Sequence, residues 1–289
     1  MDSLQHDFSR PDDYADASHI VTAPAAAAKV ALRDIPLRDP ARQIPLMRPA
    51  KAWHHFRELL KDKERTEEVF YIFEALPWRG FFDAASAFCV SDKGNAIRAA
   101  EPSLVPLLDD HAALRRLPEG SLAHAYCDFM EAEGLSAQGL VDEYAKSRGD
   151  RPVFDDQVEW YSERARDTHD LLHVLTGYGR DALGEACVLA FTYSQQPSLA
   201  NLFIGYMAGL NMKQTVKSSA PVLRAIREGQ RLGKACPRLV EESITDLLAL
   251  PLDEARRRLN ITPARHYAQA HATWRAADVD PYDLLKKAA

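Results

Sequence analysis

Apolar residues recur at helical spacing along most of this chain, from about residue 51 onward. The stretch AKAWHHFRELLKDKE, for example, places four large apolar residues on one helical face: Trp53, Phe56, Leu59 and Leu60. Runs in which β-branched and polar residues alternate, which would predict strands, are almost absent. The sequence therefore predicts an all-α fold, resembling an antiparallel helix bundle.

Residues that begin or end helices locate several of these elements. Ser121 is a candidate N-cap for a helix that ends near Gly134. One long helix is predicted from about Asp155 to Gly177, and a second helix follows with Asp181 as its cap. Further helices are predicted at 198–212, 220–235 and 242–261.

The first 46 residues differ in composition from the rest of the chain. They contain DDYADASH, TAPAAAAK and several prolines, with few large apolar residues in any regular period. Such a segment can bury little apolar surface, so residues 1–46 are predicted to form a loosely ordered N-terminal arm. Residues 47–289 are predicted to form a single helical domain.

Charge and composition exclude several classes of function. The net charge is −6, with no broad basic field, so nucleic acid is not an expected partner. The four cysteines form no C-x-x-C pair, which is typical of reduced, buried thiols. The acidic N-terminal stretch does not resemble a signal peptide, and no apolar run reaches the ~18 residues of a membrane span. The simplest inference is a bacterial cytoplasmic protein.

The stretch RDTHDLLHVLTGYGRDALGEACVLAF, residues 166–191, places polar groups in an apolar setting. His169 and His173 are four residues apart and share one face of a helix. Asp170 lies beside them in sequence, and a turn near Gly177 returns the chain as a second helix that carries Glu185. An antiparallel helix pair would bring Glu185 back to the two histidines.

Two imidazoles with one or two carboxylates form a ligand set for a divalent metal. Zinc is the first expectation, with manganese, cobalt or iron as alternatives. The candidate metal ligands are His169, His173 and Glu185, and Asp170 is either a further ligand, a base or a group that supports a ligand. The alternative is that the histidines are ordinary helix residues that bind backbone or water. Four other histidines are predicted to lie exposed on the surface: His54, His55, His266 and His271.

The motif and its surroundings resemble a known family. H-D-x-x-H followed by eleven residues and Glu, with the flanking HVLTG at 173–177, is similar to the signature of the coenzyme Q (ubiquinone) biosynthesis protein 4 family. LPEGSLAHAYCDFMEAEGLS at 117–136 is similar to the segment that precedes this signature in the family. IREGQRLGKA (226–235) and LDEARRRLNI (252–261) resemble its C-terminal part. The resemblance covers about residues 50–262 and suggests a bacterial member.

The resemblance implies a metal-dependent enzyme of ubiquinone biosynthesis. The implied reaction is an oxidative decarboxylation, in which a hydroxyl replaces the C1 carboxylate of a prenylated hydroxybenzoate ring. Implied partners are a prenylated benzenoid quinone precursor and other enzymes of the pathway. The chain would then lie peripherally on the inner face of the cytoplasmic membrane. The oligomeric state is open, with a homodimer among the alternatives.

Two residues at the motif and one uncharged stretch have candidate roles in this chemistry. Asp170 can orient a histidine or move a proton, and Arg166 can hold the substrate carboxylate; the alternative for Arg166 is a salt bridge to a neighbouring acid. The uncharged stretch 198–212, with Gly205 and Gly209 in G-x-x-x-G, is either a slot for a prenyl chain or a buried core helix.

Two other functions compete with the enzyme. The first is a non-catalytic, prenyl-lipid-binding scaffold that organises the biosynthetic complex, with a metal that only joins two helices. The second is a phosphohydrolase that uses His169 and Asp170, for which His124 and Asp181 are the candidate additional ligands.

Overall fold

The structure is a computed structural model that describes residues 35–43, 46–61, 65, 67–148 and 152–284. Within these ranges every regular element is a helix, and one isolated β-bridge joins Ser121 to Pro251. The predicted all-α class is confirmed. Residues 1–34 and 44–45 of the predicted arm lie outside the described residues.

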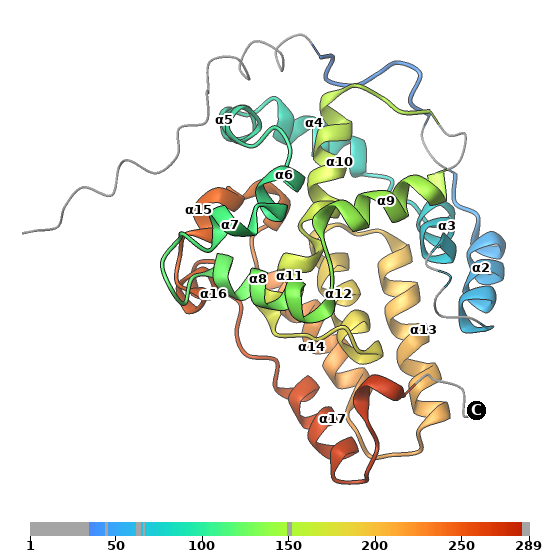
Figure 1. The fold of residues 1–289 in the computed structure, drawn as a ribbon. Coiled ribbons are helices and arrows are strands. Elements are labelled where there is room, and N and C mark those ends of the chain that lie inside the picture. Colours follow the sequence, from blue (N-terminus) through green and yellow to red (C-terminus); the bar gives the residue numbers. More distant parts are fainter. Residues whose placement is uncertain (1–34, 44–45, 62–64, 66, 149–151, 285–289) are drawn as a thin grey trace, which may run out of the picture.

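The helices follow one another with short connections (Figure 1). The elements are α2 (Pro49–Lys61), α3 (Glu67–Ala75), α4 (Phe81–Cys89), α5 (Asp92–Ala100), α6 (Val105–Asp109), α7 (His111–Leu114), α8 (Leu122–Glu133), α9 (Ala137–Arg148), α10 (Gln157–Asp167), α11 (His169–Thr176), α12 (Ala182–Gln195), α13 (Leu199–Thr215), α14 (Val222–Ala235), η1 (Leu239–Glu241), α15 (Ile244–Leu248), α16 (Leu252–Arg258), α17 (Arg265–Arg275) and η2 (Pro281–Asp283).

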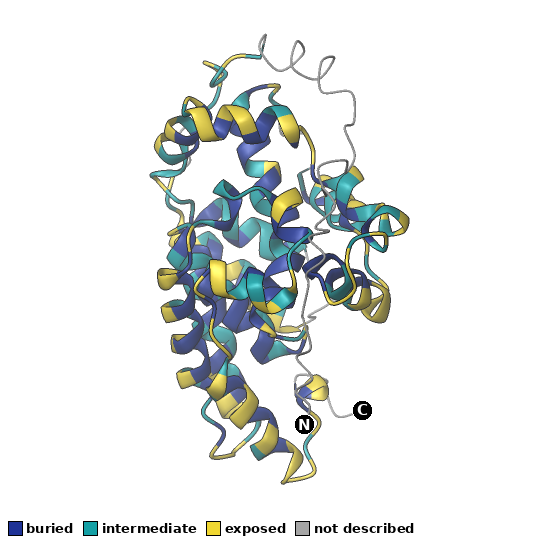
Figure 2. Ribbon diagram, turned by 90° about the vertical axis from the view of Figure 1, so that its left-hand side faces the viewer, coloured by how far each residue is buried: buried dark blue, intermediate teal, exposed yellow. Residues whose placement is uncertain are grey.

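Helices α12, α13 and α14 form the centre of the molecule, and α12 packs against both of the others. The main hydrophobic core surrounds them, together with α8, α11 and the C-terminal helices. Two smaller clusters lie under α4 with α10, and under α2 with α3 and α13. Figure 2 shows the buried faces of the helices turned toward these clusters and the exposed faces turned outward.

Glycines allow the central helices to approach closely. A Cβ added to Gly233 of α14 would lie 2.2 Å from the carbonyl oxygen of Phe191, and one added to Gly205 of α13 would lie 3.0 Å from that of Ala186. Gly209 also faces α14, where a Cβ would lie 2.4 Å from Ile226. The G-x-x-x-G face of 198–212 is therefore part of the core, as the second of the two interpretations had it.

The predicted long helix from Asp155 to Gly177 is wrong in one respect, because it is divided at Thr168 into α10 and α11. Asp156 caps the first part and accepts a hydrogen bond from the backbone N–H of Glu159. The Thr168 hydroxyl donates to the carbonyl oxygen of Arg164 at 3.0 Å, and such back-bonding bends helices. The break sets the direction of the segment that carries both motif histidines.

The predicted helix at 242–261 is also two helices, α15 and α16. Pro251 separates them, because proline has no N–H to continue the helical ladder. Leu252 instead donates its N–H to the carbonyl of Gly120 at 3.0 Å, which fixes the start of α16 beside the loop before α8.

Part of the segment that was predicted as an arm is described in the structure. Arg42 pairs with Asp156 at 2.6 Å and with Glu159 at 2.5 Å, and the N–H of Asp39 donates to Asp156 at 2.7 Å. Residues 35–43 therefore lie against the N-terminus of α10. No helix in the described part of the chain is both long and apolar enough to cross a bilayer.

We expect Gly233→Ala to lower the free energy of unfolding by about 1–3 kcal/mol, because its Cβ would overlap a backbone carbonyl that cannot rotate away. Urea unfolding followed by circular dichroism measures the change. Gly139→Ala is the matched control, since its Cβ would meet only the hydroxyl of Ser136 at 3.2 Å. Equal losses in both variants would contradict the close-packing argument.

Candidate metal centre

The turn between α11 and α12 brings the motif residues together. Gly177 adopts a left-handed conformation (φ 73°) and donates its N–H to the carbonyl of His173 at 2.8 Å, which ends α11. Asp181 then begins α12 by accepting hydrogen bonds from the N–H groups of Leu183 and Gly184. Glu185 lies one turn into α12, so its side chain returns toward α11.

The side chains of His169, His173 and Glu185 converge on one point. The Nε2 atoms of the two histidines lie 3.3 Å apart. The Oε2 atom of Glu185 lies 3.5 Å from Nε2 of His173 and 3.7 Å from Nε2 of His169. Asp170 forms a second, overlapping group with the two histidines, since His169, Asp170 and His173 each offer a ligand atom within 4.8 Å of the others. The predicted return of Glu185 to the histidines is thus seen in the structure.

The orientation of His173 is fixed by a carbonyl group. Its Nδ1 atom lies 2.9 Å from the carbonyl oxygen of Tyr178, which can only accept a hydrogen bond. Nδ1 therefore carries a proton, and Nε2 is the ring atom that faces His169 and Glu185. The Phe129 ring stacks on the His173 ring with centroids 5.6 Å apart, which further restricts its rotation.

The charges of the site act on one another. Burial by itself would raise the pKa of the Glu185 carboxyl, but hydrogen bonds and charge from His169 and His173 outweigh it and hold this pKa well below its ordinary value. Burial would likewise lower the pKa of His169, and Glu185 outweighs this effect and raises it. The lowered pKa therefore keeps Glu185 as a carboxylate beside the two imidazoles.

Comparison with known proteins places this geometry in a family. Residues 80–265, which include all four motif residues, match the family model described as coenzyme Q (ubiquinone) biosynthesis protein Coq4. The chain belongs to the Coq4 family.

Individual relatives support the assignment over shorter stretches. A ubiquinone biosynthesis protein COQ4 homolog from Mus musculus is 28% identical over 163 residues, which are 56% of this chain and 58% of the mouse protein. The homolog from Nematostella vectensis is 26% identical over 60% of this chain and 80% of its own length. COQ4 homolog 2 from Culex quinquefasciatus is 33% identical over 99 residues, and the chain spans only 41% of that relative.

A crystal structure from Nostoc punctiforme shares the fold. Its protein, which is assigned to ubiquinone biosynthesis, aligns with a TM-score of 0.52 and 21% identity. The alignment covers 74% of this chain and 98% of the Nostoc chain.

The two arginines before the Coq4 motif have different surroundings. Arg164 is buried, pairs with Glu101 at 2.6 Å and donates to the carbonyl of Val240 at 2.8 Å. Arg166 pairs with Asp167 at 2.8 Å, and its guanidinium lies over the ring of Tyr144. The structure thus gives Arg166 the neighbouring acid that was its alternative partner, and its contact with a substrate carboxylate stays a prediction.

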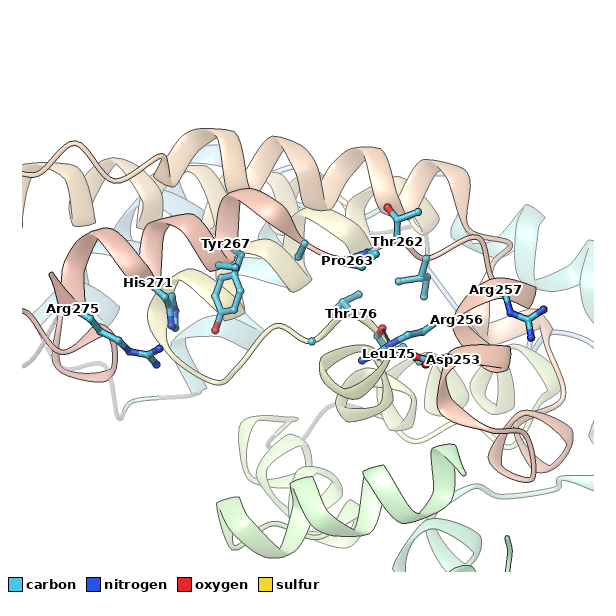
Figure 3. A pocket seen from close by; sticks show the side chains of 14 residues that line it. Leu175, Thr176, Asp253, Arg256, Arg257, Thr262, Pro263, Tyr267, His271 and Arg275 are labelled. Carbon is cyan, nitrogen blue, oxygen red and sulfur yellow. Dashed lines mark hydrogen bonds and ion pairs between the residues drawn. The ribbon is translucent and has the colours of Figure 1, made fainter. Parts of the chain in front are cut away.

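The contribution of the C-terminal helices to this centre was not predicted from the sequence. Asp181 also accepts a hydrogen bond from the Tyr267 hydroxyl and lies 3.2 Å from Nε2 of His271. The prediction that His271 is exposed is wrong: the residue is 7% exposed, because α17 packs Tyr267 and His271 against the turn after α11 (Figure 3). Arg256 of α16 donates to the carbonyls of Val174 and Leu175 at the end of α11.

The two additional ligands predicted for a phosphohydrolase, His124 and Asp181, have other partners in the structure. His124 lies 3.1 Å from the carbonyl oxygen of Arg115, and Asp181 is engaged by the cap, Tyr267 and His271. Among the described residues, a different group with metal-ligand spacing consists of His111, Cys127 and Glu131. Its Glu131 already pairs with Arg115 at 2.8 Å.

Two cavities adjoin the end of α11. The smaller, of about 290 Å³, is lined by His173, Phe129, Tyr178 and Tyr282 among others. The larger, of about 600 Å³, lies between Leu175 and Thr176 on one side and α17 on the other (Figure 3). The site therefore has open space on the sides of the turn that follows His173.

In metal-free protein, we expect Glu185→Gln to reduce stability most between about pH 4.5 and 6.5, the ordinary pKa values of a glutamate and a histidine. The lowered pKa of Glu185 stabilises the fold above 4.5, and this effect is lost as pH falls toward the folded pKa. The raised pKa of His169 stabilises it below 6.5, and this effect is lost as pH rises through the folded pKa. Thermal unfolding across pH, with chelator present, measures the difference. A pH-independent difference would contradict the ion pair.

Proposed function

We propose that this chain acts in ubiquinone biosynthesis and holds one divalent metal ion with His169, His173 and Glu185, joined by Asp170. The observation that carries the proposal is the convergence of two imidazole nitrogens and a carboxylate oxygen in a member of the Coq4 family. Both the donor set and its spacing fit a metal ion.

The donor spacing can be compared with that of a zinc site. Ligands about 2.0–2.1 Å from one zinc ion, at tetrahedral angles, lie about 3.3 Å from one another. The two nitrogens of His169 and His173 are 3.3 Å apart, and the Glu185 oxygen is 3.5 and 3.7 Å from them. Nitrogen and oxygen donors also suit manganese, cobalt and iron, with zinc as the first choice.

The proposed reaction is the oxidative decarboxylation of a prenylated hydroxybenzoate. The bond from ring C1 to the carboxylate breaks and releases carbon dioxide, and water supplies the oxygen of the hydroxyl that forms at C1. Dioxygen accepts the two electrons and two protons and leaves as hydrogen peroxide. A bound divalent ion would supply positive charge that stabilises a phenolate oxygen of the ring. Asp170 would orient His169 or move a proton, and Arg166 would exchange its Asp167 partner for the substrate carboxylate.

Exposed apolar side chains support contact with a lipid surface. Trp53 and Leu60 of α2 and Leu199 and Leu210 of α13 are each more than 40% exposed. The two helices adjoin, since the rings of Trp53 and Phe203 lie 6.3 Å apart. This face suits a peripheral protein on the inner side of a bacterial membrane. The proposed partners are a prenylated precursor and other enzymes of the pathway, and a homodimer is one proposed oligomeric state.

We expect purified protein to carry about one divalent metal per chain, and His173→Ala and Glu185→Ala each to lose it. Elemental analysis after gel filtration measures the content. His111→Ala is the control, because it removes a ligand from the other His/Cys/Glu group and leaves the proposed centre intact. Folded wild-type protein that stays metal-free after incubation with zinc, manganese or cobalt would refute the metal centre.

We expect metal-loaded wild type to convert a prenylated hydroxybenzoate, with dioxygen, to the product in which hydroxyl replaces carboxylate, and Glu185→Ala to lose this activity. Mass spectrometry of the extracted lipid identifies the product. Recovery of bound but unchanged substrate from metal-loaded protein would support the alternative, a non-catalytic prenyl-lipid-binding scaffold of the biosynthetic complex.

A further inference from the structure

One peptide group of the turn between α11 and α12 is held from both ends. The carbonyl of Tyr178 accepts the hydrogen bond from Nδ1 of His173 at 2.9 Å. The N–H of the same peptide belongs to Gly179 and donates to the hydroxyl of Tyr267 at 2.9 Å. A tyrosine on α17 thus fixes the orientation of the group that fixes the ring of His173.

The hydrogen-bond chain continues from Tyr267 into the second helix of the centre. The Tyr267 hydroxyl donates its proton to Oδ2 of Asp181, while Oδ1 of Asp181 caps α12, the helix that carries Glu185. His271 lies 3.2 Å from the same carboxylate. Tyr267 therefore connects the orientation of His173 on α11 with the start of α12.

The hydroxyl acts in this chain as both acceptor and donor. Burial, with the nearby charge of Asp181, raises the pKa of Tyr267, so the hydroxyl keeps its proton. Hydrogen bonds in such a chain polarise one another in the protein interior and strengthen together. Loss of the hydroxyl would leave the half-buried Gly179 N–H without this partner, and likewise one oxygen of Asp181, which lies inside the fold.

The residue at 179 must be small for this arrangement. A Cβ at Gly179 would lie 2.9 Å from the hydroxyl of Tyr267 and 2.7 Å from that of Tyr282. Two tyrosine hydroxyls therefore approach the same glycine, but the Gly179 N–H bonds only to Tyr267. Tyr282 is also 49% exposed, whereas Tyr267 is 8% exposed.

We propose that Tyr267 is a positioning residue of the metal centre: through the Tyr178–Gly179 peptide and Asp181 it holds the His173 ring with its proton on Nδ1 and with Nε2 turned toward Glu185. The inference rests on the proposed metal centre. Tyr267 lies beyond the segment 80–265 that matches the Coq4 family model. Hydrogen-bonding partners behind a metal-ligating histidine change metal affinity by roughly 10–100-fold.

The experiment compares the full-length variants Tyr267→Phe and Tyr282→Phe with wild type. Each variant removes one hydroxyl that lies near Gly179, and only Tyr267→Phe breaks the chain. Zinc affinity is measured by competition with a chelator, and the absorption spectrum of bound cobalt reports ligand geometry. We expect Tyr267→Phe to bind zinc roughly 10-fold more weakly with a changed cobalt spectrum, and Tyr282→Phe to match wild type.

A second readout needs no metal. In the metal-free protein, the ¹⁵N and ¹³C shifts of the His173 ring distinguish the tautomer with the proton on Nδ1 from the other one. We expect wild type and Tyr282→Phe to show the Nδ1–H tautomer, and Tyr267→Phe to populate both. Asp181→Asn breaks the hydrogen-bond chain independently, because asparagine still caps the helix but replaces the carboxylate that accepts from Tyr267. We expect this variant also to populate both tautomers of the His173 ring.

The outcomes separate the two proposals. A wild type without metal refutes the metal centre, while the ring shifts still test Tyr267. Unchanged His173 shifts in Tyr267→Phe, or equal losses of zinc affinity in the two tyrosine variants, would overturn the positioning role.

Discussion

The turn from Gly177 to Asp181 is the constraint on which the candidate centre depends. Gly177 ends α11 in a left-handed conformation, and Asp181 starts α12 four residues later. Within that short connection the chain must reverse so that Glu185 meets the two histidines. The backbone of the turn also supplies the carbonyl of Tyr178 that orients His173. A change in the path of these residues would therefore alter both the positions of the motif side chains and the tautomer of His173.

The apolar setting of the motif gives the polar groups few alternative partners. His173 is almost fully buried, and its two ring nitrogens meet Tyr178 on one side and His169 with Glu185 on the other. The facing Nε2 atoms of His169 and His173 can share one proton, and a divalent ion at the proposed centre would take the place of that proton. A proton and a divalent ion would compete for the same atoms, so metal binding at the proposed centre would depend on pH.

The sequence predicts the local features of this centre well, because they depend on neighbouring residues. The spacing of His169 and His173, the stop at Gly177 and the cap at Asp181 follow from helix geometry and are seen in the structure. The break at Thr168 was missed, since threonine within an apolar period carries no strong stop signal. The contacts of Tyr267 and His271 were missed for a different reason. They join residues 86 positions apart, from Asp181 to Tyr267, and helical periodicity contains no information on which helices pack together.

Contacts between helices distant in sequence hold the candidate centre in a rigid frame, while cavities remain beside the turn. Backbone-to-backbone packing of α14 on α12, at Gly229 and Gly233, fixes the helix that carries Glu185 from one side. Helix α17 fixes the start of that helix from another side through Asp181. The cavities lie beside the turn itself, where His173, Tyr178 and Thr176 line them. A ligand that enters there would meet side chains whose positions are already set by helices on both sides. Its binding would therefore cost little conformational entropy of the protein.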